Sequence, residues 1–544
     1  MRGPIFTVRA HAKKFILLSS FVSLIFAIFF ELRSRTILYY DELFDIQPIR
    51  ALAEGCNSLM QFHTTLIFHC FPVSATNQYQ GTIRGFLFFP LIKLKILSSE
   101  TFVAVNSILF VCTIIVFYLM VRSLTSNRVV PSLVTGLLAL QPVVWTQFAF
   151  DLGPVSTQIL LRSILLFSVL NDLRTSKICG KYTLFLSGLL IWGKLDGLWF
   201  VAGLIFGQLA VLGWKTYIRK FNLKSSLLIL GFMGAGIYAF KVSQNQYATG
   251  IALDFNDKFL SQLPNDLING ISNLVIPSGT NNLKILSFPF LLLFLVSLIG
   301  PFIPPVFKES VTYRFFLFLR IQNIVIVVFY LITPRSTAPW HTVSFFPSSV
   351  ALIATWVVLL NSREKIKSES VIYKNVSDKF LIPAIIFCIF AGGLVTYRDY
   401  STMNRGNLNP LFSKELAQAF NEIPVGNKEN SKLLFTSWGL YNPVVMDNSF
   451  KSSFKFANII DAWPWFEGEI DENKINFFRW NLESGPLSKV SSFTLVEINP
   501  SNLGARRKSL NYAEDVMHLC QVSQIAIPIK RSTSSLNVVT GNRC

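Results

Sequence analysis

Charged residues are scarce in this chain of 544 residues. Only 15% of the residues are charged, whereas 51% are hydrophobic and the mean hydropathy is +0.48. A soluble protein of this length carries far more charge. Lys and Arg (49) outnumber Asp and Glu (30), but the basic residues are scattered between apolar segments instead of forming one basic domain. This distribution argues against nucleic acid as a partner and indicates a polytopic membrane protein.

Cysteine is also rare, and the 7 cysteines form no CxxC pair or Cys/His spacing typical of zinc. We assign no metal and no tightly bound cofactor, and dependence on a free divalent ion stays open. Cys56 with Cys70 and Cys520 with Cys544 lie in segments expected outside the cell membrane, where disulfides are permitted, but free thiols are equally compatible with the sequence. The absence of GxxxxGK[ST] and GxSxG motifs disfavours ATP-driven transport and serine hydrolysis.

Long apolar runs dominate the first three quarters of the chain. A membrane-spanning helix needs about 20 apolar residues, and on that rule we predict about eleven spans. They lie near 15–32, 101–121, 131–150, 154–171, 182–193, 197–214, 225–241, 285–307, 315–333, 342–361 and 380–397. The fold class is therefore a polytopic α-helical membrane domain over residues 1–397, followed by a small soluble α/β domain over 398–544.

The positions of Lys and Arg predict the orientation of these spans. Basic residues precede the first span and recur in every second connection, for example at Arg122, Lys177, Lys220 and Lys365. The positive-inside rule places these connections and the N-terminus in the cytoplasm. The long first loop, 33–100, and the C-terminal domain are then expected on the outer side. Within the loop, 45–55 and 85–96 have the pattern of interfacial helices.

An acidic pair, Asp41 and Glu42, follows the first apolar segment directly. Acidic residues often cap a helix or face water at such a position. Carboxylates held close to the bilayer are partly desolvated, however, and partial desolvation makes a carboxylate a better base. The pair is therefore our candidate catalytic site.

Other polar residues are expected on the same outer side. Asp151 follows the third span, and Lys194 lies in a polar break with Asp196 that could be a simple buried ion pair. Arg335 and His341 fall in an external turn and could stabilise a phosphate. An ordinary turn explains Asp151 equally well, and a lone His is usually only a polar residue at the membrane interface.

Several short motifs give the chain a family resemblance. Asp41-Glu42 is followed by Ala51 to Gly55 and then by Tyr79-Gln80-Gly81 before Phe89-Pro90; later come Pro339-Trp340-His341 with Phe346-Pro347, and Trp438-Gly439-Leu440-Tyr441. In these motifs and in layout the chain resembles the GT-C class of membrane glycosyltransferases, the group that contains protein O-mannosyltransferases and lipid A aminoarabinose transferases.

The resemblance implies transfer of a sugar from a polyprenyl-phosphate donor to an acceptor hydroxyl, with inversion. Asp41 would be the base, assisted by Glu42, while Asp151 and Tyr79 would orient the acceptor or the sugar. Arg335, His341, Lys194 and Arg84 would bind the donor phosphate. The implied partners are membrane lipid, the lipid-linked sugar and a glycan, lipid or protein acceptor.

Two other functions stay open, namely a transporter or flippase of a lipid-linked sugar and a polysaccharide polymerase or ligase. A flippase needs polar residues along a path between both faces, whereas here they gather on the outer side. The only glycosylation sequon, at Asn375, lies in an expected cytoplasmic loop. This favours the inner membrane of a bacterium, with the C-terminal domain in the periplasm.

Overall fold

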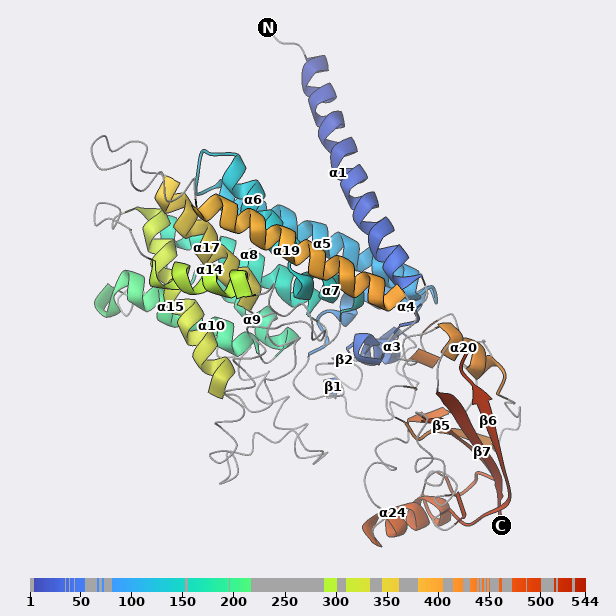
Figure 1. Ribbon diagram of the computed structural model, residues 1–544. Helices are drawn as coiled ribbons and strands as arrows, with labels where there is room; N and C mark the ends of the chain where they lie inside the picture. Colours follow the sequence, from blue (N-terminus) through green and yellow to red (C-terminus); the bar gives the residue numbers. More distant parts are fainter. Residues whose placement is uncertain are drawn as a thin grey trace, which may run out of the picture. The chain divides into compact units, whose positions relative to one another are not determined.

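The computed structural model describes most of the chain. The described residues are 4–34, 36–38, 40–43, 45–53, 66–67, 71–72, 81–151, 155–194, 196–216, 288–300, 310–332, 345–361, 380–404, 414–423, 431–437, 472–485, 487–499, 513–514, 517–530 and 534–544, with short pieces between 440 and 461. They are mostly helical, with a small sheet near the C-terminus (Figure 1).

The chain divides into two compact units. The helical unit comprises Met1–Phe29, His63–Leu87 and Val103–Ser401, and the C-terminal unit comprises Phe30–Phe62, Phe88–Phe102 and Thr402–Cys544. Parts of the long first loop, 33–100, therefore belong to the same unit as the C-terminal domain. The two helices expected in that loop are present, as α3 (Gln47–Ala53) and α4 (Gly85–Lys93).

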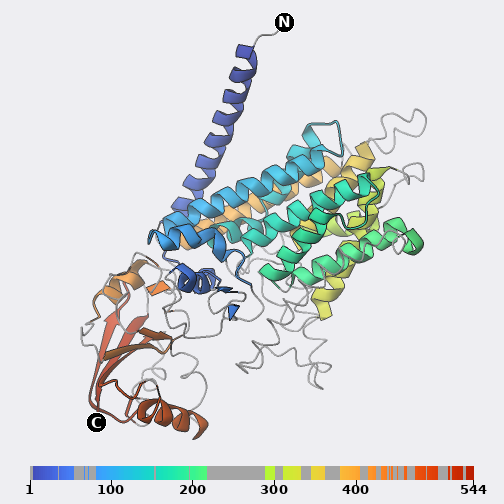
Figure 2. The ribbon, with the colours of Figure 1, turned by 180° about the vertical axis from the view of Figure 1, so that it is seen from behind.

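The helical unit is built from α-helices that run side by side (Figures 1 and 2). These helices are α5 (Ser99–Arg122), α6 (Val129–Ala139), α7 (Pro142–Phe150), α8 (Ser156–Arg174), α9 (Lys181–Gly193), α10 (Gly197–Leu212), α14 (Phe288–Ile299), α15 (Val311–Ile332), α17 (Phe346–Asn361) and α19 (Ile382–Asn404). The long α1 (Pro4–Arg33) precedes them and ends in the C-terminal unit.

Small residues allow α10 and α15 to pack closely. A Cβ atom at Gly203 or Gly207 would lie only 2.9 Å from a backbone oxygen of α15, at Gln322 and Phe318 respectively. Glycines four residues apart lie on one helix face, and this spacing is common where membrane helices approach each other. Helices α15 and α17 are joined by a polar contact, in which the Ser348 hydroxyl of α17 donates a hydrogen bond to Asn323 of α15 at 3.1 Å.

The eleven predicted spans are not supported. Two described helices, α5 and Val311–Leu331 of α15, are long and apolar enough to cross a membrane. The expected span 131–150 is divided into α6 and α7, because Pro142 lacks the N–H that would continue the first helix. Other apolar helices, such as α10, α17 and Ile382–Val395, are shorter than a span requires. The predicted span 225–241 lies outside the described residues.

The C-terminal unit contains a five-stranded sheet with the order β4-β3-β5-β7-β6. Its strands are β3 (Ser431–Phe435), β4 (Ile459–Asp461), β5 (Ser492–Asn499), β6 (Leu519–Pro528) and β7 (Ser535–Arg543). Strand β3 is parallel to β4 and β5, while β7 is antiparallel to β5 and β6. A separate two-residue pair, β1 (Leu66–Ile67) with β2 (Phe71–Pro72), belongs to the helical unit.

Helices cover both faces of this sheet. Successive strand residues point to opposite faces, so Leu433 and Phe435 pack in one core with Phe420 of α20 (Lys414–Asn421), whereas Leu434 packs in the other with Leu482 of α24 (Glu472–Glu483). Strands β3 and β5 each coincide with a short apolar run of the sequence. A sheet between helices is the α/β arrangement that the sequence predicts.

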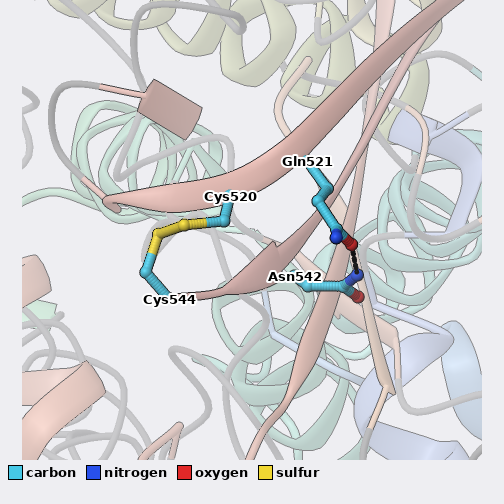
Figure 3. The surroundings of a disulfide bond; sticks show 4 residues. All are labelled: Cys520, Gln521, Asn542 and Cys544. Carbon is cyan, nitrogen blue, oxygen red and sulfur yellow. Dashed lines mark hydrogen bonds between the residues drawn. A yellow bond between two sulfur atoms is a disulfide. The ribbon is translucent and has the colours of Figure 1, made fainter.

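A disulfide bond links the start of β6 to the end of β7. Cys520, near the start of β6, is bonded to Cys544, which follows β7, with their Cα atoms 5.2 Å apart (Figure 3). Next to it, the side-chain amide of Asn542 donates a hydrogen bond to Gln521 at 3.0 Å. Of the pairs left open by the sequence, Cys520 with Cys544 is joined, and Cys56 with Cys70 lies outside the described residues.

We predict that the double variant Cys520→Ser, Cys544→Ser loses about 3 kcal/mol of unfolding free energy. The disulfide stabilises the fold because it lowers the conformational entropy of the unfolded chain. Thermal unfolding of the full-length protein, with and without reductant, measures the effect. Cys112→Ser, which removes an exposed free thiol, should unfold like the wild type. Alkylation of Cys520 or Cys544 in unreduced protein would contradict the prediction.

Candidate functional site

Arg33 and Glu42 form a buried ion pair at the start of the long first loop, 33–100. Arg33, the last residue of α1, contacts both carboxylate oxygens of Glu42, through Nη1 to Oε1 and through Nη2 to Oε2 at 3.0 Å. Its Nε donates to Ser99 Oγ at 3.3 Å, and Nη2 also donates to the Ile37 carbonyl at 3.0 Å. The guanidinium carbon lies 5.8 Å from the ring centroid of Phe102. Arg33 therefore fixes the path of the loop between α1 and the acidic pair.

The two acids of the pair are in different situations. Glu42 is wholly buried, and its two oxygens already accept hydrogen bonds from Arg33. A carboxylate bound in this way is less available to take a proton from a substrate. Asp41 lies beside it within α2 (Tyr40–Leu43), and its side chain is outside the described part of the structure. Of the two, Asp41 is the one for which the described contacts leave a catalytic role open.

In the helical unit, Asp151 binds Arg84 and caps α8. Asp151 ends α7 with a left-handed backbone (φ 45°), which turns its carboxylate towards the start of α8. That carboxylate accepts hydrogen bonds from the Val155 N–H at 2.7 Å, the Ser156 N–H at 2.8 Å and Ser156 Oγ at 2.5 Å. Capping satisfies N–H groups that the helix leaves open. Its other contact is an ion pair with the guanidinium of Arg84, and both residues are buried.

The segment before Arg84 packs against the end of α9. The Gly81 N–H donates to the Gly193 carbonyl at 3.2 Å. A Cβ atom at Gly193 would overlap the side-chain amide of Gln158 and lie 2.8 Å from Ile83, so these two side chains pack directly against the backbone of Gly193. Lys194 follows immediately and is wholly buried. These contacts bring the segment of Arg84, the end of α9 and the first turn of α8 together.

Arg162 lies one turn after Gln158 on α8 and is 0% exposed. Its Nη2 donates to Asp196 Oδ1 at 2.9 Å, and its guanidinium carbon lies 5.8 Å from the ring centroid of Phe200. The Nε and Nη1 atoms have no hydrogen-bond partner among the described residues. Leaving donors of a buried cation unsatisfied is costly. A bound oxyanion would satisfy them.

We name Arg84, Asp151, Arg162, Lys194 and Asp196 the bundle cluster. All five residues are buried, and among them three cations stand against two carboxylates. Buried charges in an apolar helix bundle need partners of opposite sign. The open donors of Arg162 suit an anionic ligand such as a phosphate.

The predicted site residues are distributed over both units. Arg84, Asp151 and Lys194 belong to the helical unit, and Asp41 and Glu42 belong to the C-terminal unit. Tyr79, Arg335 and His341 lie outside the described residues. No group of three or more His, Cys, Asp or Glu that could hold a metal ion occurs in the part of the chain that the structure describes.

Sequence reasoning missed three residues of these sites, namely Arg33, Arg162 and Asp447. Arg162 interrupts the apolar run from Ile159 to Leu170, and a lone charge within such a run is a signal of function. Arg33 borders the first predicted span, 15–32, and no short-range pattern indicates its contact with Glu42. Asp447 has no local signal, because its importance comes from a contact with Leu38, far away in the sequence.

We predict strong coupling between Arg84 and Asp151. Arg84→Met or Asp151→Asn alone should cost about 3–5 kcal/mol, because each removes one half of a buried ion pair. The double variant should cost less than the sum by about 0.5–3 kcal/mol, because each single variant already loses the same ion pair. Thermal unfolding in detergent micelles measures all four proteins. Additive losses would show that the two residues do not stabilise each other.

Comparison with known proteins gives no match: no family model matches this sequence, and no curated protein is significantly similar to it. The function must therefore be inferred from the chemistry of the residues themselves.

Proposed function

We propose that the protein is a membrane glycosyltransferase that moves a sugar from a polyprenyl phosphate to an acceptor hydroxyl. The observation that carries this proposal is Arg162 of the bundle cluster, a buried guanidinium whose Nε and Nη1 have no hydrogen-bond partner among the described residues. A phosphate attached to a long lipid is an anion that enters an apolar helix bundle together with its own hydrocarbon tail. The family resemblance of the Asp41-Glu42 segment supports the same reaction.

In the proposed reaction Asp41 is the general base. Its carboxylate takes the proton of the acceptor hydroxyl while the hydroxyl oxygen bonds to the anomeric carbon. The bond between that carbon and the phosphate oxygen breaks, and its electron pair leaves with the polyprenyl phosphate. Because a phosphate leaves as a stable anion, it needs cations more than a general acid. Attack opposite the leaving group inverts the anomeric centre.

The cations of the bundle cluster are proposed to bind the donor phosphate. Arg162 offers Nε and Nη1, and Lys194 and Arg84 add positive charge within the same buried group. Hydrogen bonds between charged groups are shorter and stronger than neutral ones. Asp151 and Asp196 then act as the partners that hold Arg84 and Arg162 in place. Arg335 and His341 remain proposed contributors.

We propose that the C-terminal unit faces an oxidising compartment, the bacterial periplasm. The disulfide between Cys520 and Cys544 supports this side, because such bonds persist outside the reducing cytosol. The alternation of basic loops along the sequence supports the same orientation. On this proposal the helical unit is embedded in the inner membrane as a multi-span GT-C-like domain, and α5 and α15 are two of its spans.

We predict that Asp41→Asn lowers sugar transfer about 10²- to 10⁴-fold, the usual worth of a general base. Membranes that contain the native acceptor are supplied with tritium-labelled undecaprenyl-phosphate hexoses and pentoses, and incorporation is measured. Glu31→Gln, which removes an exposed acid near the same end of α1, serves as the control and should keep wild-type transfer. Undiminished transfer by Asp41→Asn would exclude Asp41 as the base. Movement of the labelled lipid across the bilayer without transfer would favour a flippase instead.

We predict that Arg162→Gln weakens binding of undecaprenyl phosphate about 10- to 100-fold, the worth of a hydrogen bond to a charged group. The measurement is the lipid concentration that gives half of the maximal rise in unfolding temperature. Arg174→Gln, at the exposed last turn of the same helix, is the matched control and should bind normally. Equal binding by both variants would remove Arg162 from the phosphate site.

A further inference from the structure

The segment that precedes the acidic pair is part of the core of the C-terminal domain. Ile37 is wholly buried in the same hydrophobic cluster as Phe420 of α20, Phe435 of β3 and Val444. Thr36 and Leu38 on either side are also buried. A residue from the first external loop therefore fills a place in a core that is otherwise built from the C-terminal domain.

A polar contact fixes the same segment. The Leu38 N–H donates to Asp447 Oδ2 at 2.7 Å, and Asp447 is wholly buried. Asp447 is itself held, because its N–H donates to the Pro443 carbonyl at 2.8 Å and the neighbouring residues Val444 and Phe450 both lie in the hydrophobic cluster. The carboxylate that receives the Leu38 N–H is thus anchored to a packed core.

Contacts on both sides of Asp41 restrict its backbone. Leu38, three residues before it, is bound by Asp447, and Glu42, the next residue, is bound by Arg33. A chain extends by at most about 3.6 Å per residue, so Asp41 stays within about 11 Å of Leu38. Arg33 also binds the Ile37 carbonyl at 3.0 Å, which joins the two sets of contacts. All of these residues belong to one compact unit.

We propose that Asp447 is a positioning residue for Asp41, and that the C-terminal domain holds the general base in place. This inference rests on the proposed function. Asp447 acts through the backbone of residues 38–42 and contacts no substrate. Displacement of a catalytic group by about 1 Å can cost about 10² in rate. Loss of the Asp447 contact should therefore lower kcat and leave the donor site of the helical unit unchanged.

Two variants separate positioning from folding. Asp447→Ala removes the acceptor of the Leu38 N–H, whereas Asp447→Asn keeps an oxygen that can accept it. In the full-length protein, hydrogen exchange of the Leu38 amide should become at least about 10-fold faster in Asp447→Ala, because the amide loses its partner, and should stay near wild type in Asp447→Asn. This readout requires no enzymatic activity. Glu483→Ala, at an exposed position of α24, is the control.

The kinetic arm uses whichever labelled undecaprenyl-phosphate sugar the wild type consumes. We expect Asp447→Ala to lower kcat about 10- to 100-fold with less than about a 2-fold change in donor KM, and Asp447→Asn to restore kcat. Normal exchange and normal kcat in Asp447→Ala would overturn the proposal. The proposal would also be overturned if Asp447→Ala lost kcat, donor binding and thermal stability together and Asp447→Asn did not restore them. If the wild type transfers no sugar, the proposed function fails, and the exchange result alone decides whether Asp447 holds Leu38.

Discussion

The ion pair between Arg33 and Glu42 is the contact on which the arrangement of the segment after the first helix depends. It joins the end of the first helix to the acidic pair, and the same guanidinium binds the Ile37 carbonyl and the hydroxyl of Ser99. A buried guanidinium is stable only when its donors and its charge are matched. The loop therefore has little freedom to move relative to these partners, because any displacement would leave Arg33 or Glu42 buried without a counter-charge.

The same physical constraint shapes the helical unit. Asp151 satisfies the charge of Arg84 and the open N–H groups of α8 with one carboxylate. Asp196 accepts a hydrogen bond from only one nitrogen of Arg162, Nη2. The other two, Nε and Nη1, have no partner among the described residues. The two pairs differ in this respect: both oxygens of Asp151 are bound within the protein, whereas the guanidinium of Arg162 keeps two donors without a partner among the described residues.

Local patterns in the sequence predicted those features that depend on neighbouring residues. The interfacial patterns at 45–55 and 85–96 correctly predicted helices α3 and α4. Helix ends were harder to predict, because apolar composition continues past Pro142 although the α6 helix does not. Hydropathy averages over about 20 residues and is insensitive to such a break. This break is one reason why the eleven spans are not supported, and the short apolar helices are another.

Long-range contacts could not be predicted from the sequence. The sequence places Asp41 and Glu42 side by side and gives them equal chemistry, and only the contact with Arg33 separates their roles. Likewise, nothing near Asp447 indicates that its carboxylate binds the backbone of Leu38, far away in the chain.

One consequence concerns how an acidic pair can work at all. Two adjacent carboxylates that were both free would repel each other, and each would make the other harder to ionise. Neutralising Glu42 with Arg33 removes that repulsion while keeping the backbone of its neighbour fixed. A base needs both its charge and a defined position. On the proposed function, Glu42 serves Asp41 by binding Arg33, and the pair acts as one base and one anchor instead of two bases.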